Sequence, residues 1–212
     1  MDSVKKITDI PVIISKKEVL QMLNCDADCS SYGAVSDLYD EVLEDTRALL
    51  DPVILFCFGT VPKEYASGDM KEGEELIYAI TSVGGEVSRR SSAAFRQGDP
   101  LSGMLLNAIA DSALFHMEES LNRVLRKACT DRKRGILKRL EAPQDIPMET
   151  QKLVFEQTHA AQLYQMKISS GFMLDPVKSS ANIFLLTSDE KVFRAQHDCR
   201  NCSKLDCSMR KE

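Results

Sequence analysis

Apolar residues recur at two spacings along the chain, and the spacing separates predicted strands from predicted helices. Uninterrupted or β-branched apolar runs predict strands at 7–15, 53–59, 75–85 and 180–188. Apolar residues three and four positions apart predict helices at 16–24, 34–50, 85–99 and 148–165, and a longer helix from 99 to about 130. These elements show no regular β-α-β alternation, which favours an α+β fold.

The long helix has the clearest sequence signature. Asp99 supplies an N-cap acceptor and Pro100 suits the first helical position. Its predicted inner face is apolar and is formed by Leu101, Met104, Leu105, Ala108, Ile109, Ser112, Phe115 and Leu121. The basic run at 126–139 predicts the solvated end of this helix, and residues 189–196 are expected to pair with 180–188 as a hairpin.

Composition and charge narrow the class of protein. The 212 residues are 43% hydrophobic and 28% charged, with a net charge of −5. Such a chain has no general attraction for polyanions, so nucleic acid is disfavoured as a partner. It holds no run of about 20 apolar residues, and its start does not read as a signal peptide. We therefore expect a cytoplasmic protein, and its oligomeric state is left open.

The segment HDCRNCSKLDCSMRKE (197–212) concentrates metal-binding residue types. Cys199, Cys202 and Cys207 follow a C-x2-C-x4-C spacing, and His197 lies two residues upstream. Thiolates suit zinc or an iron–sulfur cluster, and three cysteines leave a fourth ligand open. That ligand is His197, Cys25, Cys29 or an external group. A tail with free thiols or a redox disulfide are the alternatives.

The sequence signals for other chemical sites in the chain are weaker. Cys57 and Cys129 lie in apolar surroundings and are expected to be packing residues. SVGGE (82–86) places Gly84 and Gly85 between a strand and a helix. Either the backbone amides there bind an anion or a cofactor carbonyl, or the glycine pair only makes the turn. The chain lacks G-x-S-x-G, G-x-G-x-x-G and the P-loop pattern.

Four stretches occur in the order ITSVGGEVSRR, GDPLSGMLLNAIADSALFHMEE, DIPMETQKLVF and FMLDPVKSSANIFLL. Together they resemble the activation domain of cobalamin-dependent methionine synthase, and more closely its free-standing relatives in anaerobes. The matching positions are Thr81, Gly84, Gly98, Asp99, Ala108 to Asp111, Met173, Pro176, Lys178 and Ser179. The resemblance covers roughly residues 75–188.

The resemblance implies a C-shaped α+β domain built on a bent, mainly antiparallel sheet flanked by helices. We predict this domain at 1–190, followed by a cysteine-rich metal-binding tail at 191–212. It also implies contact with cobalamin, through Gly84, Gly85, Lys178, Ser179 and Phe184.

The sequence departs from the family in the loop that binds S-adenosylmethionine, which reads like R-x-S-P-G-Y-x-D-x-P. Here RLEAPQDIP (139–147) matches at Arg139, Asp145 and Pro147 but lacks the Gly-Tyr pair. Glycine at that position lets a backbone approach a ligand closely, so its loss argues against S-adenosylmethionine binding. Phe184 stands where the family has a tyrosine that faces the corrinoid.

Three functions follow as hypotheses. The first is a corrinoid-associated protein that binds cobalamin, or a cobalamin-carrying partner in a methyltransferase system, and assists its reductive reactivation. An iron–sulfur cluster at the tail cysteines is a candidate electron source. The second is a non-enzymatic, zinc-stabilised interaction module, and the third is a component of an S-adenosylmethionine-dependent methyltransferase. The sequence identifies no catalytic residue.

Overall fold

The computed structural model describes residues 3–205, 207 and 210; the remaining positions of the predicted tail lie outside the described residues. A five-stranded sheet has the order β1-β2-β3-β7-β4, and each neighbouring pair of strands is antiparallel. Its strands are β1 (Lys5–Ile7), β2 (Val53–Thr60), β3 (Glu75–Ser82), β7 (Ser179–Thr187) and β4 (Gly135–Glu141). A two-stranded ribbon joins β5 (Lys167–Ile168) and β6 (Leu174–Asp175).

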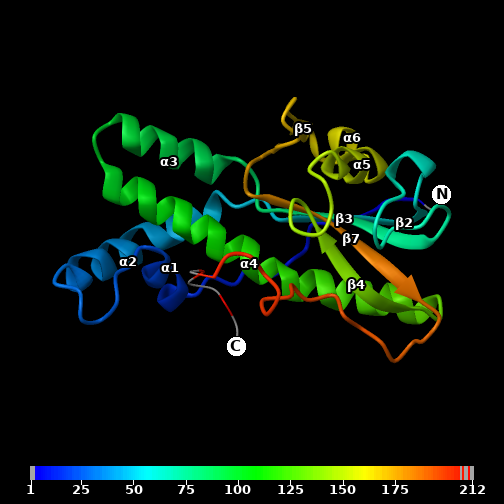
Figure 1. The fold of residues 1–212 in the computed structure, drawn as a ribbon. Helices are drawn as coiled ribbons and strands as arrows, with labels where there is room; N and C mark the ends of the chain where they lie inside the picture. Colours follow the sequence, from blue (N-terminus) through cyan, green and yellow to red (C-terminus); the bar gives the residue numbers. More distant parts are fainter. Residues whose placement is uncertain (1–2, 206, 208–209, 211–212) are drawn as a thin grey trace.

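Helices lie on both faces of the sheet (Figure 1). They are α1 (Lys16–Met22), α2 (Tyr32–Ala48), α3 (Glu86–Arg96), α4 (Pro100–Asp131), α5 (Thr150–Gln157) and α6 (Ala160–Tyr164), with a short 3-10 helix at Lys63–Tyr65. The predicted α+β class, with a mainly antiparallel sheet flanked by helices, is confirmed. No helix in the described part of the chain is both long and apolar enough to cross a membrane.

The alternation of side chains along the strands divides the core into two layers. On one face, Phe56, Ile77 and Phe184 pack against the second half of α4, including Met117 and Leu121. The opposite face packs against α5 and α6 through Leu55, Tyr78, Ile183, Leu153 and Ala160, among others. The first half of α4 extends past the sheet and packs on α1 and α2.

The start of α4 confirms the predicted cap and corrects the predicted inner face. The Asp99 carboxylate accepts a hydrogen bond from the Ser102 N–H at 3.1 Å, with Pro100 in the first turn. Leu101 and Met104 remain 37% and 44% exposed, although they were expected to be buried. The reason is that α3 packs against the Gly103 side of this turn, where the Ser91 hydroxyl donates to the Gly103 carbonyl at 2.7 Å.

Two strand predictions were too long or misplaced. The strand expected at 7–15 shortens to β1, since Pro11 has no N–H for a ladder and residues 8–15 run as irregular chain. Residues 189–196 form turns and a single parallel bridge between Ile136 and Phe193, instead of the expected hairpin strand. Both sides of β7 are already taken, by β3 and β4.

The basic run at 126–139 is not wholly the end of a helix. Helix α4 stops at Asp131, and β4 begins at Gly135 with Ile136 and Leu140 buried. The predicted helix at 148–165 is two helices, because His159 adopts a left-handed conformation (φ 51°) between α5 and α6. Lys138, Arg139 and Glu141 interrupt the apolar residues of β4, and this concealed the strand from its hydrophobic pattern.

Candidate functional site

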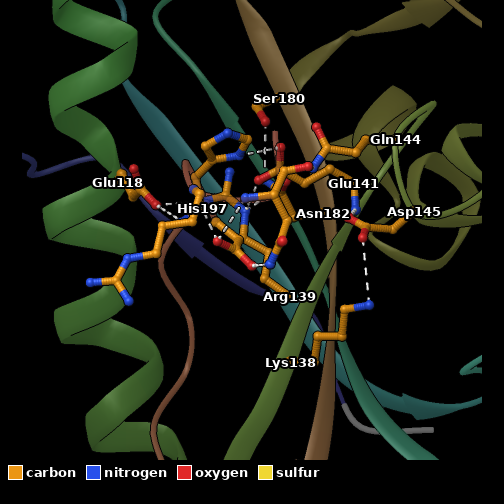
Figure 2. Close-up of polar contacts among 12 residues, drawn as sticks. Glu118, Lys138, Arg139, Glu141, Gln144, Asp145, Ser180, Asn182 and His197 are labelled. Atoms are coloured by element: carbon orange, nitrogen blue, oxygen red, sulfur yellow. Dashed lines mark hydrogen bonds and ion pairs between the residues drawn. The ribbon is translucent and has the colours of Figure 1, made fainter. Parts of the chain in front are cut away.

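A cluster of charged and polar side chains lies between α4 and the β4 side of the sheet (Figure 2). Arg139 on β4 is 11% exposed and forms ion pairs with Glu118 of α4 and Glu141 of β4. Its Nε also donates to Asn182 Oδ1 of β7 at 3.2 Å. One guanidinium therefore joins three elements, which suits the fixed fork of arginine.

His197 reaches this cluster from the segment after β7. Its backbone N–H donates to Glu118 Oε1 at 2.9 Å, and its Nδ1 lies 2.9 Å from Glu141 Oε2. Burial disfavours the imidazolium, but the Glu141 carboxylate and a hydrogen bond with Cys202 together raise the pKa of His197 above its ordinary value. The chain following β7 is thus held against the sheet and α4 by two carboxylates.

Two cavities meet at this cluster. The first, of about 780 Å³, lies against α4, the sheet and the end of α1; its lining includes Thr81, Asn107, Asp111, Phe115 and Ser180. The second, of about 1170 Å³, follows β4 and the chain after β7. Arg139, Glu141 and His197 line both cavities. The first cavity combines an apolar wall with carboxylate, amide and hydroxyl groups, a lining typical of small-ligand sites.

The C-terminal tail forms part of the first cavity. Lys204 and Cys207 line it, opposite residues of α1 and the sheet. Figure 1 shows the red C-terminal segment running along α4 towards α1. Access to the cavity therefore depends on where the tail lies.

Of the predicted cofactor-binding residues, four form one group, and Arg139 and Phe184 lie apart from it. Gly84, Gly85, Lys178 and Ser179 gather where β3 ends and β7 begins; there the Gly84 N–H donates to Ser82 Oγ and the Ser179 hydroxyl to the same oxygen. Lys178 connects this group to the cavity, since its Nζ lies 2.6 Å from Oδ1 of Asp111, a cavity residue.

Arg139 belongs to the cavity cluster, and Phe184 belongs to neither group. Phe184 is fully buried in the layer between the sheet and α4. Its ring presents no surface to a ligand in this structure, because its strand position points it at the core.

The predicted metal ligands come together only in part. The Lys204 N–H is the main cause that lowers the pKa of the Cys202 thiol, and the His197 side chain is the second. Cys199, Cys202 and Cys207 are half-buried free thiols. Across residues 3–205, 207 and 210, no group of three or more His, Cys, Asp or Glu side chains is placed to hold a metal ion.

The sequence missed most of the cluster's acidic and amide residues. Glu118, Glu141 and Asn182 lie on three separate elements and carry no spacing that connects them. The sequence did carry a signal for Asp111, because this residue lies in the Ala108 to Asp111 stretch that matches the methionine synthase pattern. The packing cysteines behave as predicted: burial raises the pKa of both Cys57 and Cys129 to about 11.

Comparison with known proteins gives a likeness of fold. The crystal structure of the MetH reactivation domain bound to AdoHcy has a similar fold, with a TM-score of 0.64 over 92% of this chain and 82% of that one. The two sequences are 11% identical. No model of a known protein family matches the chain, and no curated protein matches it by sequence. The chain therefore shares the α+β fold of the MetH reactivation domain.

Proposed function

We propose that this protein is a corrinoid-associated protein of the cytoplasm. It meets cobalamin, held by a partner corrinoid protein or methyltransferase, and assists reductive reactivation of the cofactor. The single observation that carries the proposal is the fold, which it shares with the MetH reactivation domain over 92% of the chain. The sequence stretches that resemble the methionine synthase activation domain support it independently.

The cavity between α4 and the sheet is the proposed contact region. Its volume of about 780 Å³ is within the range of roughly 300–1,000 Å³ for sites of drug-sized ligands. A complete cobalamin is much larger than such a ligand, so we propose that the cobalamin stays on the partner and only part of it is contacted. Asn107, Asn182 and Ser180 offer hydrogen-bonding groups for the amide side chains of a corrin ring.

The test is an anaerobic visible spectrum of cob(II)alamin, free and on a corrinoid protein, with and without this protein. Binding should shift the spectrum of the partner-held cofactor, and Asp111→Asn should weaken binding by about tenfold. Asp37→Asn, at an exposed position on α2, is the matched control and should change nothing. Unchanged spectra for both cofactor forms would refute the proposal.

The tail cysteines are proposed as a metal site that is either an iron–sulfur cluster or zinc. His197 and Cys202, already in contact, are the first two ligands proposed, with Cys199 and Cys207 completing the set. A cluster would supply the electron that reactivation requires; zinc would fix the tail, and the electron would then come from a separate carrier. Anaerobic purification with iron, sulfide and zinc analysis distinguishes them, and a Cys202→Ser variant that keeps stoichiometric metal would exclude the site.

A second candidate is direct binding of an adenosyl ligand. The cavity has a suitable size, and the structural neighbour was crystallised with AdoHcy. Asp111 and Glu118 are suited to ribose hydroxyls or an ammonium group, and Arg139 to a carboxylate. Calorimetric titration with AdoHcy tests this directly, and absence of heat at millimolar ligand would exclude it, whatever the result with corrinoids.

A further inference from the structure

The loop between α1 and α2 holds two cysteines that the proposed function does not use. Cys25 follows Asn24, which has a left-handed conformation (φ 52°), and the Cys25 N–H donates to the Leu20 carbonyl at 2.9 Å. This is the hydrogen bond of a Schellman turn, which closes α1. The turn directs Cys25 into the core, where it is 4% exposed among Val19, Leu20 and other apolar side chains.

Two further turns bring the second cysteine back to the first. The Cys29 N–H donates to the Asp26 carbonyl at 3.0 Å, and the Tyr32 N–H donates to the Cys29 carbonyl at 3.0 Å. The chain reverses here, so that the half-buried Cys29 packs against the same apolar cluster that contains the buried Cys25. One thiol is therefore accessible and its neighbour is held behind it.

The start of α2 is organised around the Cys29 sulfur. Ser31 is the N-cap residue of this 17-residue helix, yet its side chain makes no capping hydrogen bond to the backbone. Its hydroxyl lies 3.1 Å from Cys29 Sγ instead. A helix N-terminus and a hydroxyl donor both stabilise a thiolate, which is the nucleophilic form of cysteine. The pKa of Cys29 is accordingly lowered by the Ser31 contact, and that of Cys25 is raised by burial first and then by Cys29.

We propose that Cys25 and Cys29 form a reversible dithiol–disulfide site that reacts with small-molecule disulfides such as glutathione disulfide. The Cys29 thiolate attacks the disulfide, forms a mixed disulfide and releases one thiolate. Cys25 then gives up its proton to solvent and attacks the Cys29 sulfur, releasing the second thiolate. The two protein thiols are oxidised to one disulfide and the external disulfide is reduced to two thiols.

The sequence allows this reaction to be followed in the full-length wild-type protein. Cys25 and Cys29 lie on a single tryptic peptide, 18–47, whereas Cys199, Cys202 and Cys207 fall on three others. After equilibration with glutathione redox buffers, acid quenching and alkylation, mass spectrometry should find peptide 18–47 with two hydrogen atoms fewer and without label. If that peptide keeps both thiols, or carries only glutathione, in an oxidising buffer, the proposal fails.

The order of attack has its own test. In the native protein Cys29 should react with iodoacetamide at least about tenfold faster than Cys25, Cys57 or Cys129. Cys25→Ser should accumulate the mixed disulfide at Cys29, whereas Cys29→Ser should form little at Cys25. Equal labelling rates of Cys25 and Cys29 in the wild type would contradict the assigned roles, even if a variant fails to fold. These measurements need no corrinoid, so their outcome is separate from that of the proposed function.

Discussion

His197 Nδ1 lies 2.9 Å from Glu141 Oε2, and this contact joins the chain after β7 to the edge strand β4. It sets the position of the tail, because Ala195 is fully buried before it and Lys204 and Cys207 line the cavity beyond it. The pair is thus the connection between the folded sheet and the segment that covers the candidate site.

Loss of the Glu141 charge should release the tail. Glu141→Gln removes the attraction to the imidazole but keeps the side-chain volume. Trypsin cleavage after Arg200 and Lys204 in the native protein should then accelerate by roughly tenfold. Glu190→Gln, at an exposed position, serves as the control and should leave the cleavage rate unchanged. Equal rates for the two variants would show that the contact does not hold the tail.

Removal of the Arg139 guanidinium should be strongly destabilising. Arg139→Met leaves the carboxylates of Glu118 and Glu141 partly buried without their cation, at a cost of about 3 kcal/mol in the free energy of unfolding. Urea denaturation measures this, with exposed Arg90→Met expected within about 0.5 kcal/mol of wild type. The double variant Glu118→Gln/Arg139→Met should recover part of the loss, and additive losses would argue against the ion pair.

Gly84 should not tolerate alanine. Its φ is +85°, and an added Cβ would lie 3.0 Å from Asp51 Cβ and 3.3 Å from the Asp51 nitrogen. We expect Gly84→Ala to cost about 2–3 kcal/mol in the free energy of unfolding. Gly73→Ala isolates the contribution of the backbone conformation, since Gly73 also has positive φ (+78°) but open space around it. A cost at Gly73 equal to that at Gly84 would show that the Asp51 contact contributes nothing.

The cap of α4 gives a pH-dependent contribution to stability. Hydrogen bonds from Ser102 lower the pKa of Asp99 below its ordinary value of 3.8. A group with a lowered folded-state pKa contributes stability that is present above its unfolded-state pKa and is lost as pH falls through the folded-state pKa. The wild-type advantage in melting temperature over Asp99→Asn should therefore be constant above about pH 5 and shrink in more acidic solution. Asp99→Ala loses the cap at every pH and serves as the uncapped reference. A wild-type advantage over Asp99→Asn that grows on acidification would contradict the assignment.

The hydrophobic pattern by itself determined the main elements. Strands β2 and β3 and the centre of β7 are buried on both faces, so their apolar runs were unambiguous. Helix α4 was fixed locally by the Asp99 cap, Pro100 and its repeating apolar positions. The order of short motifs was enough to indicate the fold of the methionine synthase activation domain, which the structural likeness confirms at the level of fold.

The tertiary structure alone decided the edge of the sheet and the site. The charged residues of strand β4 predict the end of a helix, and only pairing with β7 defines this segment as a strand. Glu118, Arg139, Asn182 and His197 come from distant parts of the chain and meet because α4 crosses the sheet face beside β4. Such contacts depend on the packing of whole elements, so no local spacing in the sequence encodes them. The same packing turned Phe184 into the core and laid the tail over the cavity.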